Sequence, residues 1–68
     1  MRLSARNRFV GKITELKLGT IMAHVVIQVG EHAVESVITR RSAEEMMLKV
    51  GDTVAAVIKS TDVLIQKA

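Results

Sequence analysis

The 68-residue chain contains no cysteine, proline, tryptophan or tyrosine, and its one aromatic side chain is Phe9. Without cysteine, the chain has neither disulfide bridges nor thiolate metal ligands, which often stabilise domains of this size. Without proline or a low-complexity tract, nothing marks a linker between two units. We therefore expect a single domain, residues 1–68, whose small core needs association with other subunits for stability.

Long apolar runs are also missing from the sequence. No segment is long and uncharged enough to span a bilayer, and the first residues lack the apolar run of a secretory signal. We therefore expect a soluble, cytoplasmic protein without a membrane partner. Ten Lys and Arg residues against seven Asp and Glu give a formal net charge of +3. This small basic excess, spread along the chain, favours anionic ligands in general.

The sequence carries no recognisable catalytic motif. It has no cysteine nucleophile, no Gly-x-Ser-x-Gly turn and no glycine-rich phosphate loop. We therefore expect a protein that is not an enzyme. The two histidines, His24 and His32, have no carboxylate at a recognisable ligand spacing, so we interpret them as solvated or interface residues. We expect no site for a bare metal cation.

The apolar residues, 49% of the chain, follow the periodicity of β-strands. Residues 20–29 alternate most clearly, with an apolar side chain at every odd position from Ile21 to Val29. Further strands are predicted at residues 8–16, 33–39, 53–59 and 62–66, with turns at 17–19 and 30–32. Ser42 and Glu45 have the spacing of a capping box, which predicts a helix of about two turns starting there.

This element order predicts an all-β fold, a five-stranded OB-like (oligonucleotide/oligosaccharide-binding) Greek-key barrel with one short helix between strands 3 and 4. Barrels of this type often bind single-stranded nucleic acids by stacking bases on aromatic rings. Phe9 alone is a poor stacking platform, although Arg2, Arg6 and Arg8 form a basic edge. An OB-type nucleic-acid-binding module and a purely structural oligomerisation module are therefore kept as alternatives.

Hydrogen-bond donors gather near both ends of the chain. They combine hydroxyls, two cations and an amide with a small residue that lets a ligand approach the backbone: Ser4, Ala5, Arg6, Asn7, Lys59, Ser60 and Thr61. A small tetrahedral dianion needs such converging donors. The same residue types also build ordinary polar turns between strands. Composition alone leaves both interpretations of the two segments open.

The two end segments, residues 4–7 and 57–63, occur together with Gly11, Lys12, residues 36–39 and Ser42. In this combination they closely resemble the molbindins, small cytoplasmic molybdate-binding proteins built from the Mop, or TOBE-like, domain. The resemblance covers nearly the whole chain. It implies binding, storage and buffering of molybdate, or of tungstate, at the subunit interfaces of a homohexamer arranged as a trimer of dimers.

The resemblance also implies positions for two kinds of oxyanion site. The first uses the seven end residues named above, with Arg6 and Lys59 supplying positive charge. The second, near a threefold axis, is implied at Gly19, Thr20, Ile21, Ser36, Val37, Ile38 and Thr39. Met22 stands where members of the family often have asparagine, so a polar donor is lost if Met22 faces that second site.

Overall fold

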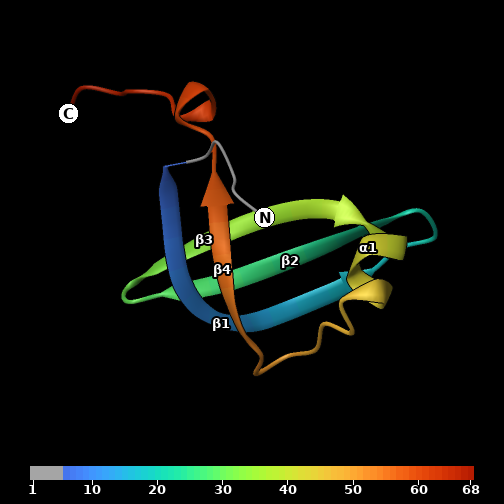
Figure 1. The fold of residues 1–68 in the computed structure, drawn as a ribbon. Coiled ribbons are helices and arrows are strands. Elements are labelled where there is room, and N and C mark those ends of the chain that lie inside the picture. The colour runs from blue at the N-terminus through green and yellow to red at the C-terminus, as the bar shows by residue number, and fades with distance from the viewer. Residues whose placement is uncertain (1–5) are drawn as a thin grey trace.

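The computed structural model describes residues 6–68, which form a curled antiparallel sheet with a short helix at one end (Figure 1). The strands are β1 (Asn7–Leu18), β2 (Met22–Val29), β3 (His32–Thr39) and β4 (Thr53–Ile58). The helix α1 (Arg40–Glu45) connects β3 to β4, and a 3₁₀ turn, η1 (Ser60–Asp62), follows β4. The strand order in the sheet is β3-β2-β1-β4. The predicted fold class and the helix between strands 3 and 4 are confirmed.

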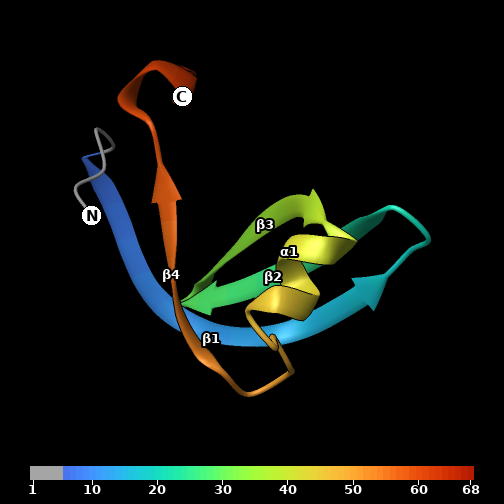
Figure 2. The same ribbon diagram turned by 45° about the vertical axis from the view of Figure 1, so that its right-hand side comes forward.

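The strand β1 joins the two halves of the sheet. Its N-terminal part, up to Lys12, pairs with β4, and its C-terminal part, from Lys12 onward, pairs with β2. The register with β2 shifts between Ile13 and Glu15, and such irregularities bend a strand. Figure 2 shows β1 curving strongly, so that its first half stands beside β4 and its second half lies along β2.

The core lies on the inner face of this curled sheet. The odd-numbered residues Ala23, Val25 and Ile27 of β2 are buried, which confirms the predicted alternation. Ile13 of β1 packs with Val25 and Ile27, and α1, which carries the buried Ala43, lies at one end of the sheet (Figure 1). Because few side chains are fully buried, a single chain gains only modest hydrophobic stabilisation.

The predicted fifth strand at residues 62–66 is wrong. The chain turns through η1 after β4, and the residues that follow belong to no strand. Figure 1 shows this C-terminal segment leaving the sheet, and Leu64 and Ile65 are 92% and 91% exposed. A strand needs a neighbouring backbone to pair with, and among residues 6–68 no strand lies beside this segment. The barrel is therefore open, with β3 and β4 as its unpaired edges.

The start of α1 also differs from the prediction. The helix begins at Arg40, and Thr39 rather than Ser42 is its N-cap. The Thr39 hydroxyl accepts a hydrogen bond from the Ser42 N–H at 3.1 Å and donates to the Ser42 hydroxyl at 2.8 Å. Glu45 does not close a capping box but accepts a hydrogen bond from Arg41 at 3.2 Å. Threonine and serine cap helices by the same mechanism, so the sequence offers two candidate N-caps within one helical turn of each other.

The first predicted turn is displaced by two residues. Pairing of β1 with β2 continues to Leu18, and the turn comprises residues 19–21. It is closed by the Gly19 N–H, which donates to the Met22 carbonyl at 2.8 Å. The second turn, predicted at residues 30–32, is found at Gly30 and Glu31, where Gly30 has a φ of 59°.

Gly11 allows β1 to approach β2 closely at the curve. A Cβ atom at this position would lie 2.2 Å from the backbone oxygen of Gln28. We expect Gly11→Ala to lower the free energy of unfolding by about 3 kcal/mol, because backbone must move to relieve the overlap. Urea unfolding at one fixed protein concentration measures this change.

Gly30→Ala is the matched control for Gly11→Ala. No atom lies within 4 Å of the place that a Cβ would take at Gly30, so the cost comes from the positive φ alone and is about 1–2 kcal/mol. Wild-type stability in Gly11→Ala would contradict the close approach of the two strands.

The C-terminus of α1 is a Schellman motif with an unusual residue. The Leu48 N–H donates to the Ala43 carbonyl at 3.1 Å, and the Met47 N–H donates to the Glu44 carbonyl at 3.0 Å. Met47 has a φ of 52°, a conformation that normally favours glycine. The residue is 80% exposed, so its side chain gains little from packing. The motif therefore holds a strained backbone without compensating burial.

We expect Met47→Gly to raise the free energy of unfolding by about 0.5–1 kcal/mol. The gain is the relieved left-handed strain, reduced by the greater freedom of glycine in the unfolded chain. Met46→Gly is the control, because Met46 has an ordinary right-handed conformation (φ −81°) and its replacement should destabilise the chain. Thermal unfolding of both variants shows whether stability rises in Met47→Gly and falls in Met46→Gly. A loss of stability in Met47→Gly would contradict the presence of backbone strain at Met47.

Candidate functional site

Pairing of β1 with β4 brings the two end segments of the chain together. Asn7 lies opposite Ile58, so Arg6 and Lys59 are the next residues along two adjacent antiparallel strands. Ser60 and Thr61 follow in η1 at the same end of the sheet. Ser4 and Ala5 of the predicted site lie outside the residues that the structure describes. Arg6, Asn7, Lys59, Ser60 and Thr61 form what we call the end cluster.

The polar groups of the end cluster are suited to an anion. Within residues 6–68, none of its side chains forms a hydrogen bond or an ion pair with another residue. Two of its carbonyl oxygens are already occupied, since Lys59 and Ser60 accept from the N–H groups of Asp62 and Val63 at 2.9 and 3.4 Å. Side-chain donors and positive charge therefore remain unengaged, while two of the backbone acceptors are in use.

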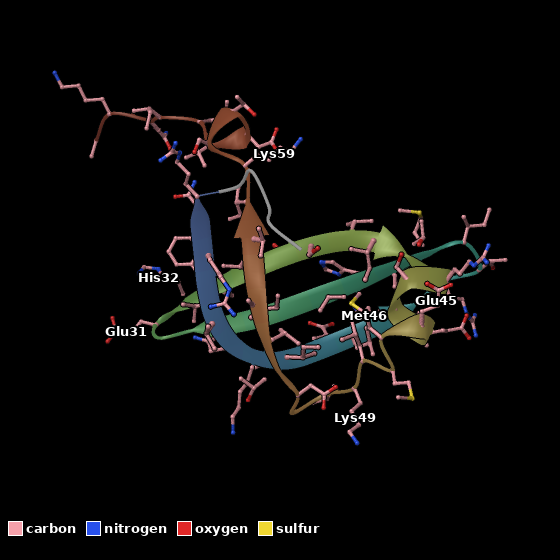
Figure 3. All side chains as sticks on the ribbon, in the orientation of Figure 1. Glu31, His32, Glu45, Met46, Lys49 and Lys59 are labelled. Carbon is pink, nitrogen blue, oxygen red and sulfur yellow. The ribbon has the colours of Figure 1, made fainter. Side chains whose placement is uncertain are left out.

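The end cluster lies open on the surface of one chain. Asn7 is half-buried, and the other members are exposed. Figure 3 shows Lys59 where the chain leaves β4, far from Lys49 before the start of that strand. An anion held only here would remain largely hydrated, so the cluster has the chemistry of an oxyanion site but not its enclosure.

A second group of predicted residues meets at the opposite end of the molecule. The turn at residues 19–21 lies next to the junction of β3 and α1, where the Arg40 N–H donates to the Ile21 carbonyl at 2.8 Å. Between them is an open depression of about 410 Å³, which we call the turn pocket. Its lining residues are Thr20, Ile21, Thr39, Arg40, Arg41 and Glu44.

The other residues implied for the second site do not line the turn pocket. Ser36 and Ile38 belong to the inner side of β3, where they line the apolar hollow of the open barrel. Val37 is exposed on the other face of the same strand. Met22 lies opposite Thr39 in the β2–β3 register but is not a lining residue, so it takes no donor away from this pocket.

The sequence interpretation missed Arg40 and Arg41. With a helix predicted to start at Ser42, the two arginines belong to a connection and have no role. In the structure Arg40 donates from Nη1 to the Gly19 carbonyl at 3.1 Å, across the pocket from its own helix. Two adjacent arginines directly before a predicted helix would have been the available signal.

His24 has a carboxylate partner that sequence spacing did not reveal. Its Nε2 lies 2.8 Å from Oε1 of Glu35 on the neighbouring strand. Within residues 6–68 no group of three or more His, Asp or Glu side chains is arranged to hold a metal ion.

Among the helices of residues 6–68, none has the length and apolar character needed to cross a membrane.

An open barrel of antiparallel strands, with hydrogen-bond donors and positive charges gathered at two ends, has the make-up of a small ligand-binding module. The family model of the TOBE domain matches residues 3–65 of the chain. The chain therefore belongs to the TOBE domain family, as its resemblance to the molbindins implied.

Relatives of the chain, both short and long, carry names that refer to molybdenum. The chain is 47% identical over 66 residues to molybdenum-pterin-binding protein 1 of Clostridium pasteurianum, and the match covers 96% of this chain and 97% of the relative. It is 39% identical over 66 residues to the molybdenum transport protein ModE of Azotobacter vinelandii, but this match covers only 24% of ModE. The domain therefore occurs both alone and as part of longer proteins.

Two solved structures that share this fold are molybdate-binding proteins. A molybdate-binding protein from Sporomusa ovata superposes with a TM-score of 0.94 at 31% identity, covering 98% of this chain and 100% of the other. The cytoplasmic molybdate-binding protein ModG, in a form with molybdate bound, gives a TM-score of 0.82 at 33% identity. That match covers 88% of this chain and 43% of ModG. The chain therefore shares the three-dimensional fold of these proteins as well as part of their sequence.

Proposed function

We propose that this chain binds molybdate, or tungstate, and that it stores and buffers the oxyanion in the cytoplasm without transforming it. The observation that carries the proposal is the meeting of Arg6 and Lys59 at paired ends of β1 and β4, with unengaged side-chain donors around them. Relatives named as molybdenum- and molybdate-binding proteins, one of them cytoplasmic, support the choice of ligand and compartment.

The chemistry of the end cluster favours molybdate over phosphate. Near neutral pH molybdate is fully deprotonated, whereas phosphate keeps a proton that needs an acceptor. The end cluster offers hydroxyl, amide and cationic donors, and its Lys59 and Ser60 carbonyls are already occupied. Arg6 and Lys59 can only donate, and a hydroxyl of Ser60 or Thr61 that accepts the phosphate proton can no longer donate to the anion, which costs binding free energy.

The open barrel supports a homo-oligomer. The hollow between β3 and β4 is lined by apolar side chains, among them Ile13, Leu48 and Val54. The exposed C-terminal segment, residues 63–65, is apolar and begins with Val63 in an extended conformation. We propose that this segment of one subunit covers the open edge of another, in a homohexamer built as a trimer of dimers.

Such an assembly would complete the end cluster. Lys59, Ser60 and Thr61 directly precede the segment that would cross to the neighbouring subunit. The anion would then be enclosed between subunits, where it exchanges water for fixed donors and is bound more strongly than on an open surface. We assign the first oxyanion site, including Ser4 and Ala5, to this interface, and a second site to the turn pocket.

Calorimetric titration with molybdate, tungstate, sulfate and phosphate tests the proposed function. We expect saturable binding of molybdate, with phosphate at least about tenfold weaker because its proton occupies a hydroxyl that would otherwise donate. Equal affinity for all four anions would indicate a nonspecific cationic surface instead.

Arg6→Ala combined with Lys59→Ala tests the end cluster. Loss of two charge-assisted hydrogen bonds should weaken the first class of site by about 100-fold or more. Lys12→Ala combined with Lys49→Ala is the matched control, since it removes two positive charges near the other end of β4. If the control lost as much affinity as the test variant, overall charge rather than the cluster would be responsible.

Leu64→Asp combined with Ile65→Asp tests the C-terminal segment. Burial of two carboxylates in an apolar interface is strongly unfavourable, so the mass measured by light scattering should fall below that of wild type. Gln66→Asp combined with Ala68→Asp adds the same charge just beyond the apolar residues and should keep the assembly intact. An unchanged mass in the Leu64 and Ile65 variant would contradict the proposal that this segment of one subunit covers the open edge of another.

A further inference from the structure

One residue of α1 holds both ends of the turn that lines the turn pocket. The backbone N–H of Arg40 donates to the Ile21 carbonyl at 2.8 Å, and its Nη1 donates to the Gly19 carbonyl at 3.1 Å. The Gly19 N–H in turn donates to the Met22 carbonyl at 2.8 Å. The conformation of residues 19–21 is therefore tied to the position of a single arginine.

These contacts determine which groups of the turn remain for a ligand. Carbonyl oxygens repel an anion, whereas amide N–H groups attract it. Arg40 occupies the carbonyls of Gly19 and Ile21, while nothing in residues 6–68 accepts a hydrogen bond from the N–H of Thr20 or Ile21. The turn thus keeps the amides of Thr20 and Ile21 unengaged, while two of its three carbonyl oxygens, those of Gly19 and Ile21, are covered.

Arg41 provides a contrast within the same helix turn. Its guanidinium donates to Glu45 at 3.2 Å, and its side chain is 88% exposed. The Arg40 side chain is 42% exposed, and its Nε lies 3.6 Å from the Glu44 carboxylate. Both arginines line the turn pocket, but the contacts to the turn come from Arg40.

We propose that Arg40 is the positioning residue of the second oxyanion site. Its Nη1 and its backbone N–H hold the two ends of the turn so that the amides of Thr20 and Ile21 face a ligand. Its guanidinium, whose Nε lies 3.6 Å from the Glu44 carboxylate, lines the pocket beside them. The inference rests on the proposed function, because it requires that the protein binds molybdate at two kinds of site. It adds a residue that the family resemblance did not assign.

Titration of molybdate into wild type, Arg40→Ala, Arg40→Lys and Arg41→Ala tests this role. We expect Arg40→Ala to weaken the second class of site by about tenfold or more, as for loss of one charge-assisted hydrogen bond. The first class should keep its affinity and so serves as an internal control. Arg40→Lys keeps the charge but not the planar fork and should remain weaker than wild type, while Arg41→Ala should bind as wild type does.

A spectroscopic readout separates positioning from a general effect on folding. In wild type, molybdate should shift the amide resonances of Thr20 and Ile21, and in Arg40→Ala these shifts should be lost while those of Arg6 and Asn7 persist. If Arg40→Ala does not fold, the same amide shifts are compared between wild type and Arg40→Lys.

The outcomes distinguish this inference from the proposed function. No binding of molybdate to wild type would overturn both. Two classes of site in wild type that both persist in Arg40→Ala would overturn the role of Arg40 alone, as would a single class in wild type. Wild-type affinity in Arg40→Lys, or an equal loss in Arg41→Ala, would show that charge rather than positioning is responsible.

Discussion

In this molecule one strand, β1, forms backbone ladders with two partners along different parts of its length. The arrangement is possible only because β1 curves, and the curve depends on Gly11, where a side chain would overlap the backbone of β2. Both groups of candidate site residues are placed by this strand. Arg6 and Asn7 stand at its start, and the turn at residues 19–21 follows its end. The geometry of the sheet and the position of the sites therefore have a common origin.

The sequence predicts those parts of the fold that depend on local periodicity. Alternation in residues 20–29 predicts the face of β2 that is buried, because side chains of a strand point to opposite sides in turn. The fifth strand fails for a nonlocal reason. Val63, Leu64 and Ile65 have the composition of a strand, but pairing needs a second backbone, and the single chain places none beside them. Composition describes the preference of a segment and not the presence of its partner.

The same distinction applies to the sites. The end cluster was predictable as a set of donor types, and β1–β4 pairing supplies the proximity that the residue types alone do not. Arg40 was missed because its proposed role depends on a hydrogen bond to a carbonyl 21 positions earlier in the chain. Thr39 was missed as the N-cap because Ser42 offers an equivalent hydroxyl. Contacts between distant segments and choices between equivalent caps are set by the folded structure.

The exposed C-terminal segment has a consequence for how the protein would work as a store. If the residues that complete the first site come from a neighbouring subunit, capacity for the oxyanion depends on assembly, and assembly depends on protein concentration. Diluting the protein would then release ligand even at constant free molybdate. A cell that makes little of the protein would hold disproportionately little molybdate in it, so that synthesis of the chain itself becomes a control on the size of the reserve.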